Sequence, residues 1–241
     1  MTGFIKNGLV SRSFSQTATS GVHEMDLNFV LDYRDEFMKG IETTLAVAAS
    51  GLALSLLIGA FLALIRLSPW LYLRQLSKIY VAFFQNVPLL IIVFFFYYGL
   101  PVLNIALSEV MCGLLGLVVY NAAFVAEQIR AGIEAVPKGQ SEAAAATGMN
   151  YVQTMRLVVL PQAIKIVIPA VGNQMINIVK GTSVLALIAG GDMMYRADIV
   201  SSQTFLVFNV YLVVAVFYLL VNIPLNILVR VLERRWQVRR T

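Results

Sequence analysis

Five apolar segments of this chain are each long enough to cross the hydrocarbon core of a membrane. They cover residues 40–65, 79–100, 110–129, 157–179 and 205–229. Roughly 20 helical residues cross the 30 Å or so of hydrocarbon in a typical bilayer. Inside lipid, every backbone polar group must be bonded within the protein, so such segments predict helices. The sequence therefore predicts an all-α integral membrane protein built as a bundle of five transmembrane helices.

The composition agrees with this class. The chain is 59% hydrophobic and only 13% charged, whereas about a quarter of the residues of a soluble domain are charged. Its mean hydropathy is +0.79. A sixth apolar stretch, residues 184–191, is too short to span. We expect it to continue the fourth helix or to pack as a half-helix covered by protein.

Several kinds of site are excluded by what the sequence lacks. It contains no phosphate-binding loop, one cysteine and one histidine. Neither a disulfide framework nor a Cys/His metal cluster can be built from these within one chain. We expect no catalytic residues, no metal and no cofactor bound by this chain. If ATP powers the system, another chain binds it.

Basic residues predict the orientation in the membrane. One set of connections carries most of them: Arg66, Arg74, Lys78, Arg130, Lys138, Arg156 and the tail from Arg230 to Arg240. By the positive-inside rule this side is cytoplasmic, which places the N-terminus outside and the C-terminus inside. The formal charge of +5 is thus a topology signal and gives no reason to propose nucleic-acid binding.

The N-terminal residues are more polar than the rest of the sequence. Residues 1–24 form a polar extension without the continuous apolar core of a signal peptide. Residues 25–241 are predicted to form a single transmembrane domain, with Met25 as a candidate functional start.

A polar segment between the third and fourth spans carries the most specific motif. Its order is Glu142-Ala143-Ala144, then Gly148, then Leu160-Pro161. Pro137 suits the first turn of a short helix and Gly148 its end, so residues 140–147 can form about two helical turns within the segment of about 137–150. Small alanines allow close seating against a partner, while Gln140 and Glu142 offer polar contacts. A plain alternative is an Ala-rich helix with a glycine stop.

This motif resembles the EAA loop of the membrane subunits of ATP-binding-cassette importers, which serves as the coupling helix. Three further segments resemble the polar amino acid uptake family, the glutamine, glutamate, histidine and arginine importers. They are residues 80–101 with Asn86 and Pro88, residues 120–150, and residues 180–198 with Val184 where that family has Leu.

The resemblance implies a type I importer fold and a defined set of partners. These are a second permease subunit, identical or related, and a dimer of cytoplasmic ATPase subunits that bind ATP and Mg. An external or periplasmic solute-binding protein would deliver the amino acid substrate. It also implies a multi-pass protein of the bacterial cell membrane.

Polar residues inside predicted spans are the candidate site residues, since they are costly at that depth. Asn121 lies in the third span. Glu127 and Arg130, three residues apart, are expected to form an inner-interface pair or gate brace. In the fourth span Asn173, Gln174 and Asn177 form a polar run in which Asn173 and Asn177 share one face, which suits a subunit contact as well as a substrate wall. Pro88 and Pro161 are assigned structural or gate roles.

Thr182 and Ser183 are predicted to contact the substrate together with Asn121, because their hydroxyls could hold an amino acid's carboxylate. The resemblance implies a mid-membrane site there. The alternative is that both hydroxyls bond carbonyls of their own helix. Since Ala186 and Leu187 follow instead of an acid, we expect a non-basic substrate such as glutamine or glutamate.

Two other functions remain open at this point. The same type of subunit could carry methionine or an organic anion. A self-sufficient secondary transporter or membrane enzyme is disfavoured, because the chain shows no inverted repeat and no clustered carboxylates inside its spans.

Overall fold

The computed structural model describes residues 28–236, and these form helices joined by short loops without a strand among them. The predicted extension over residues 1–24 and Met25 lie outside the described residues. The elements are α2 (Asn28–Asp32), α3 (Arg34–Arg66), α4 (Leu71–Asn86), α5 (Leu89–Phe94), η1 (Phe95–Gly99), α6 (Leu100–Val102), α7 (Glu109–Glu134), α8 (Lys138–Ala146), α9 (Tyr151–Thr154), η2 (Met155–Val159), α10 (Leu160–Gly181), η3 (Thr182–Ile188), α11 (Met193–Thr204) and α12 (Val207–Trp236).

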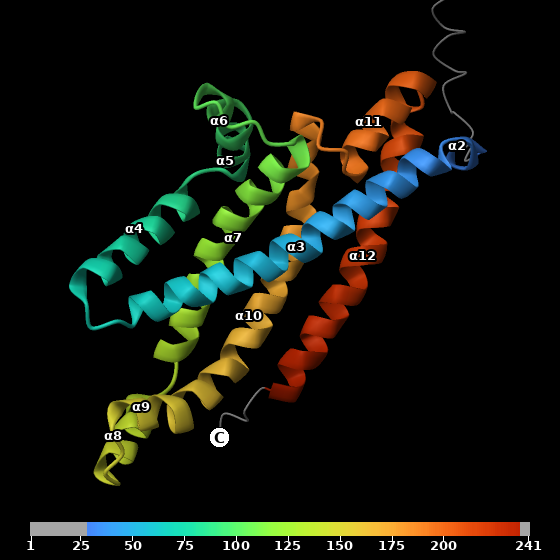
Figure 1. Ribbon diagram of the computed structural model, residues 1–241. Helices are drawn as coiled ribbons and strands as arrows, with labels where there is room; N and C mark the ends of the chain where they lie inside the picture. The colour runs from blue at the N-terminus through green and yellow to red at the C-terminus, as the bar shows by residue number, and fades with distance from the viewer. Residues whose placement is uncertain (1–27, 237–241) are drawn as a thin grey trace, which may run out of the picture.

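Four of the described helices are long and apolar enough to cross a membrane. They span Arg34–Arg66, Glu109–Glu134, Tyr151–Ile188 and Val207–Arg235, and the total rises to five if one bent helix pair counts as a span. Helices α3, α7, α10 and α12 form the body of the bundle (Figure 1). The prediction of an all-α membrane bundle is confirmed.

The second predicted span, residues 79–100, contains a sharp bend that the sequence analysis does not predict. The chain bends by 106° between Leu71–Asn86 and Leu89–Val102. Val87 is extended, with φ −99° and ψ 131°. Proline disfavours the helical conformation in the residue before it, so Pro88 forces this break and starts the next helix. The apolar pattern runs through the bend, because both arms carry apolar side chains.

The core is closely packed where α3 crosses α7. A Cβ placed on Gly59 would lie 2.6 Å from the Val125 side chain and 2.9 Å from the Ala122 carbonyl oxygen. Only glycine permits this approach of the two backbones. Small residues at crossings are typical of membrane helices, which associate mainly through close packing. The position of α7 against α3 is therefore set by a glycine contact.

The sixth apolar stretch behaves as predicted. Thr182–Ile188 forms a 3₁₀ segment that continues α10, and it stops at Ala189, which is left-handed with φ 57°. Asp192 then caps α11 by accepting from the backbone N–H groups of Met194 and Tyr195. The turn between α10 and α11 is thus a covered half-helix followed by a capped helix.

The two ends of the bundle carry different elements (Figure 1). Helices α8 and α9 lie at one end together with the end of α12, whereas α2, α6 and α11 lie at the other. The basic residues of the first end, Arg66, Arg74, Arg130, Lys138, Arg156, Arg234 and Arg235, come from the connections that the sequence groups on one side. The connections that the basic residues group on one side of the membrane therefore lie at one end of the bundle.

Candidate functional site

A cavity of about 250 Å³ lies between α5, α7 and α10. Apolar and aromatic side chains make up part of its wall, and three amides make up the rest. Its lining consists of Leu89, Leu117, Tyr120, Asn121, Phe124, Gln174 and Asn177. Among residues 28–236, the side chains that line it include no charged group. Its volume is slightly below the usual range for drug-sized ligands, about 300–1,000 Å³, which suits a smaller polar molecule.

Two of the lining amides are bonded to each other across the helices. Asn121 on α7 is 3% exposed and Gln174 on α10 is 4% exposed. Gln174 Nε2 donates to Asn121 Oδ1 at 2.5 Å, and Asn121 Nδ2 donates to the Leu117 carbonyl at 2.7 Å. Gln128, further along α7, donates through Nε2 to Gln174 Oε1 at 3.3 Å. We call Asn121, Gln174 and Gln128 the amide chain.

The remaining polar surface of the cavity is available to a ligand. Asn177 is exposed on the wall. The rings of Tyr120 and Phe124 lie beside each other with centroids 4.9 Å apart. Aromatic faces attract ammonium groups, and amides donate to and accept from carboxyl and amide groups. The wall therefore offers an aromatic face to an ammonium group, and amides to carboxyl or neutral polar groups.

Thr182 and Ser183 do not line this cavity. Thr182 is fully buried, and its hydroxyl donates to the Val179 carbonyl at 2.8 Å. The Ser183 hydroxyl donates to the Lys180 carbonyl at 2.8 Å. Both bonds are the own-helix bonds that the alternative interpretation describes. Of the three predicted substrate residues, the structure places Asn121 alone on the cavity wall.

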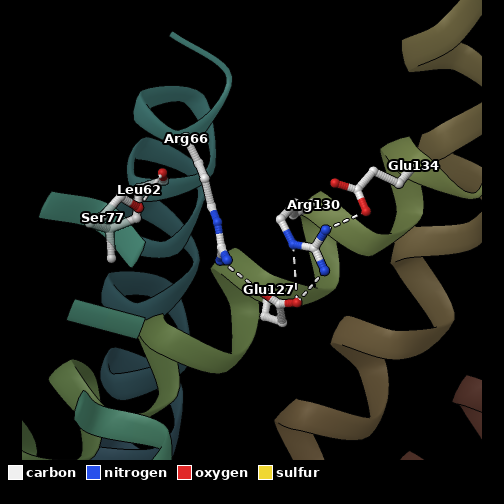
Figure 2. Close-up of polar contacts among 6 residues, drawn as sticks. All are labelled: Leu62, Arg66, Ser77, Glu127, Arg130 and Glu134. Carbon is white, nitrogen blue, oxygen red and sulfur yellow. Dashed lines mark hydrogen bonds and ion pairs between the residues drawn. The ribbon is translucent and has the colours of Figure 1, made fainter. Parts of the chain in front are cut away.

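A charged network joins α3 and α7 near the α8 end of the bundle (Figure 2). Glu127 receives Arg66 Nη1 at 2.6 Å from α3, and Arg130 Nε at 3.0 Å from its own helix. Arg130 also pairs with Glu134. The predicted Glu127–Arg130 pair is present, and Arg66 is an additional partner. One carboxylate holds two cations, which ties α3 to α7.

The start of α4 is attached to the same place. The Ser77 hydroxyl donates to the Leu62 carbonyl on α3 at 3.0 Å, close to the Arg66 end of that helix (Figure 2). Ser77 is 1% exposed. The hydroxyl bond and the charged network fix α3, α4 and α7 together below the cavity.

Helix α8 has the bounds that the motif predicts. It begins after Pro137 and ends at Thr147, with Gly148 in the left-handed conformation at φ +84°. The Met149 N–H donates to the Ala144 carbonyl at 3.2 Å and the Gly148 N–H donates to the Ala145 carbonyl at 2.9 Å. These two bonds form a Schellman C-cap, which favours glycine at the left-handed position.

The motif residues divide between two faces of α8. Ala144 is buried at 6% exposure, so it packs within the chain. Glu142 and Ala143 are exposed. Gln140 accepts from Gln162 Nε2 at 3.2 Å, a bond from α8 to α10. The face of α8 that points away from the chain thus carries Glu142 and small side chains.

Pro161 lies where α8 and α9 connect to α10. The five residues before Leu160 form a π-helical turn, η2, and Pro161 occupies the first turn of α10. Proline supplies no backbone N–H, which agrees with a change of helical type at this point. The chain thus passes from α9 through η2 into α10 without a loop.

The sequence did not reveal the partners of these residues. Gln174 is named in the sequence analysis only as part of the polar run of α10, and Gln128 is not named there. Arg66 was assigned only to the basic side. Amides within spans were the available signal for the first two, and a basic residue at a span end was the signal for the third.

The fold and this site define a class: a helical membrane subunit with a polar internal cavity and an exposed helix for a partner. Residues 55–238 match the model of the binding-protein-dependent transport system inner membrane component. The chain belongs to this family.

Curated relatives are similar over most of the chain. The probable glutamine ABC transporter permease protein GlnM of Bacillus subtilis (strain 168) is 46% identical, covering 88% of this chain and 98% of GlnM. The probable amino-acid ABC transporter permease protein PatM of Vibrio harveyi is 35% identical, covering 80% of this chain and 88% of PatM.

Solved structures share the fold. A crystal structure of an amino acid ABC transporter with histidines is 32% identical, with a TM-score of 0.84 over 87% of this chain and 98% of that one. An inward-facing methionine transporter, MetNI, has a TM-score of 0.60 at 17% identity over 86% of this chain and 99% of that one, which shows the fold alone.

Family membership confirms the predicted class of function. The chain is a permease subunit of an amino acid ABC importer, a multi-pass membrane protein with a transport role and not an enzymatic one. The family implies an ATPase that binds nucleotide, a second permease and a binding protein. The EAA segment and the coupling helix are consistent with it.

Proposed function

We propose that this chain forms the path of a polar amino acid with an uncharged side chain, glutamine being the leading candidate, through the cavity between α5, α7 and α10. The observation that carries the proposal is the wall itself, which combines amides and aromatic rings without a charged side chain among the described residues. A charged side chain would be desolvated there without a counter-ion, which is unfavourable. The naming of GlnM for glutamine supports the same class.

Coupling is assigned to the outer face of α8. In this proposal a cytoplasmic ATPase dimer, which binds ATP and Mg, holds Glu142 and the exposed alanines, while Gly148 sets the end of the helix. Gln140 and Pro161 pass the movement to α10. Ala144 supports the helix from the buried side. The α8 end then faces the cytoplasm of a bacterial cell, and the start of α2 faces outside.

The complete transporter would contain two permease subunits, two ATPases and an external solute-binding protein. Each permease would contribute one cavity and one α8, so movement of two ATPases would open both paths toward one side. Whether the second permease is a copy of this chain follows from the mass of the intact complex.

The test is uptake of labelled glutamine by cells that carry the complete importer, comparing wild type with Glu142→Lys. We expect uptake to fall sharply in the variant, with less ATPase co-purifying and unchanged permease in the membrane. Lys138→Glu, at the first residue of α8, is the matched charge reversal outside the EAA residues. Uptake and ATPase retention equal to wild type in Glu142→Lys would refute the assignment of α8.

A further inference from the structure

Each side-chain amide of the amide chain has one orientation of its donor and acceptor ends, and a backbone carbonyl sets the first of them. The Leu117 carbonyl can only accept, so the Asn121 side chain must turn Nδ2 toward it. Asn121 Oδ1 is then the atom that meets Gln174, which must present Nε2. Gln174 Oε1 in turn faces Nε2 of Gln128. Because an amide has one donating and one accepting end, each orientation follows from the one before it.

At the far end of the amide chain, the Gln128 amide keeps the same orientation although one of its atoms is left unpaired. Gln128 Oε1 is buried and has no hydrogen-bond partner in the described part of the protein. Turning the Gln128 amide over would place Oε1 against Gln174 Oε1, so that two acceptors would meet. An unpaired buried acceptor is unfavourable, yet it is retained here because the reversed amide is worse.

We infer that Gln174 is the specificity-determining residue of the cavity and that Gln128 is a positioning residue that holds its amide. This inference rests on the proposed transport function and names the residues that select its substrate class, amino acids whose side chain is polar and uncharged. Gln174 lies in the cavity wall with a neutral amide that Asn121 and Gln128 hold from both ends. Neither a cationic nor an anionic side chain finds a counter-ion beside it.

A carboxylate at position 174 would invert this preference. It would face Asn121 Oδ1, and Asn121 cannot turn over because the Leu117 carbonyl holds its Nδ2. A cation in the cavity would relieve the repulsion between the two acceptors. Gln174→Glu should therefore favour substrates with a cationic side chain.

The experiment measures competition by arginine and lysine against uptake of labelled glutamine, in cells that carry the complete importer. In Gln174→Glu we expect the ratio of arginine to glutamine competition to rise roughly tenfold or more. Gln75→Glu is the matched control: this exposed residue of α4 lies outside the cavity wall, so the same added charge should leave the ratio unchanged.

Gln128→Leu separates positioning from packing. Loss of positioning should raise the glutamine concentration for half-maximal uptake roughly fivefold, at similar permease abundance. A packing role alone would lower abundance and maximal rate and leave the half-maximal concentration unchanged.

The outcomes distinguish this inference from the proposed function. A wild-type competition profile in Gln174→Glu, at normal abundance, overturns the inference while glutamine uptake by wild type preserves the function. A wild-type importer that takes up no amino acid overturns the function itself. If Gln174→Glu does not reach the membrane, Gln128→Leu decides, and an unchanged half-maximal concentration then overturns the inference.

Discussion

Helix α7 contains two polar regions less than two turns apart. The polar side chains of one are bonded to a neutral amide, and those of the other to charged groups. At its middle, Asn121 bonds a neutral amide of α10. Near its end, Glu127 bonds two arginines, one of them from α3. Among the described residues, the side chains that line the cavity around Asn121 are all uncharged. The second is partly exposed, with 31% of the Glu127 side chain accessible.

The difference follows from depth in the bundle. Charges are tolerated where water and opposite charges are both close, whereas the middle of a membrane helix favours neutral groups that satisfy one another. The charged region holds helices together, and the neutral region leaves a wall that a substrate can use. The same helix therefore supplies both the brace and the cavity.

The largest expected effect on stability comes from the charged region. Glu127→Leu would leave Arg66 and Arg130 side by side without their shared carboxylate, which should lower the free energy of unfolding by about 2–3 kcal/mol. Glu134→Leu is the control, because the Glu134 side chain is 62% exposed and exposed pairs contribute about 0.2–1 kcal/mol. Thermal unfolding in detergent measures both; equal losses would contradict the special role of Glu127.

A smaller effect is expected in the neutral region. Asn121→Leu removes the acceptor for Gln174 Nε2, and an unpaired buried donor costs about 1–2 kcal/mol. Ser183→Ala removes a bond to its own helix, so we expect about 0.5 kcal/mol or less of change. The same unfolding assay ranks the two variants. A larger loss for Ser183→Ala than for Asn121→Leu would contradict the greater weight given to the bond between α7 and α10.

At the C-terminal end of the exposed helix α8, the backbone conformation determines how much a substitution of glycine destabilises the protein. Gly148→Ala should destabilise by about 1 kcal/mol, because its φ of +84° is unfavourable for a residue with a Cβ. Gly139→Ala is the matched control within the same helix. Neither position has an atom within 4 Å of an added Cβ, so sterics do not differ. Hydrogen exchange of α8 measures the effect, and equal protection in both variants would contradict it.

Asp192 gives a pH-dependent effect of the order of 1 kcal/mol. Burial raises the pKa of this carboxyl from 3.8 to about 6. Between these values the folded protein binds a proton that the unfolded chain does not. The free energy of unfolding should therefore rise as the pH falls from 7 to 5, and Asp192→Asn should remove this component. Identical pH slopes in wild type and variant would show that Asp192 does not cause it.

Much of the fold could be predicted from the sequence because bilayer burial imposes a strong pattern. Four spans, the covered half-helix after α10 and the bounds of α8 follow from apolar length, proline and glycine. The bend at Val87 was missed because apolar residues continue across it. Pro88 was the signal, through its effect on the preceding residue.

The site was predicted less completely, for a physical reason. A sequence shows that Asn121, Thr182 and Ser183 are polar at depth, but not the rotation of α7 against α10. That rotation decides whether a side chain meets another helix or its own carbonyls. Gln174 and Arg66 became visible as partners only once the helices were packed together.

The most direct test of the account is the competition profile of the wild-type importer with labelled glutamine. The uncharged wall predicts that unlabelled glutamine competes at a concentration roughly tenfold or more below that of arginine or glutamate, since charged side chains lose hydration without a counter-ion. Arginine competing as well as glutamine would contradict the assignment of an amide-lined path for neutral side chains.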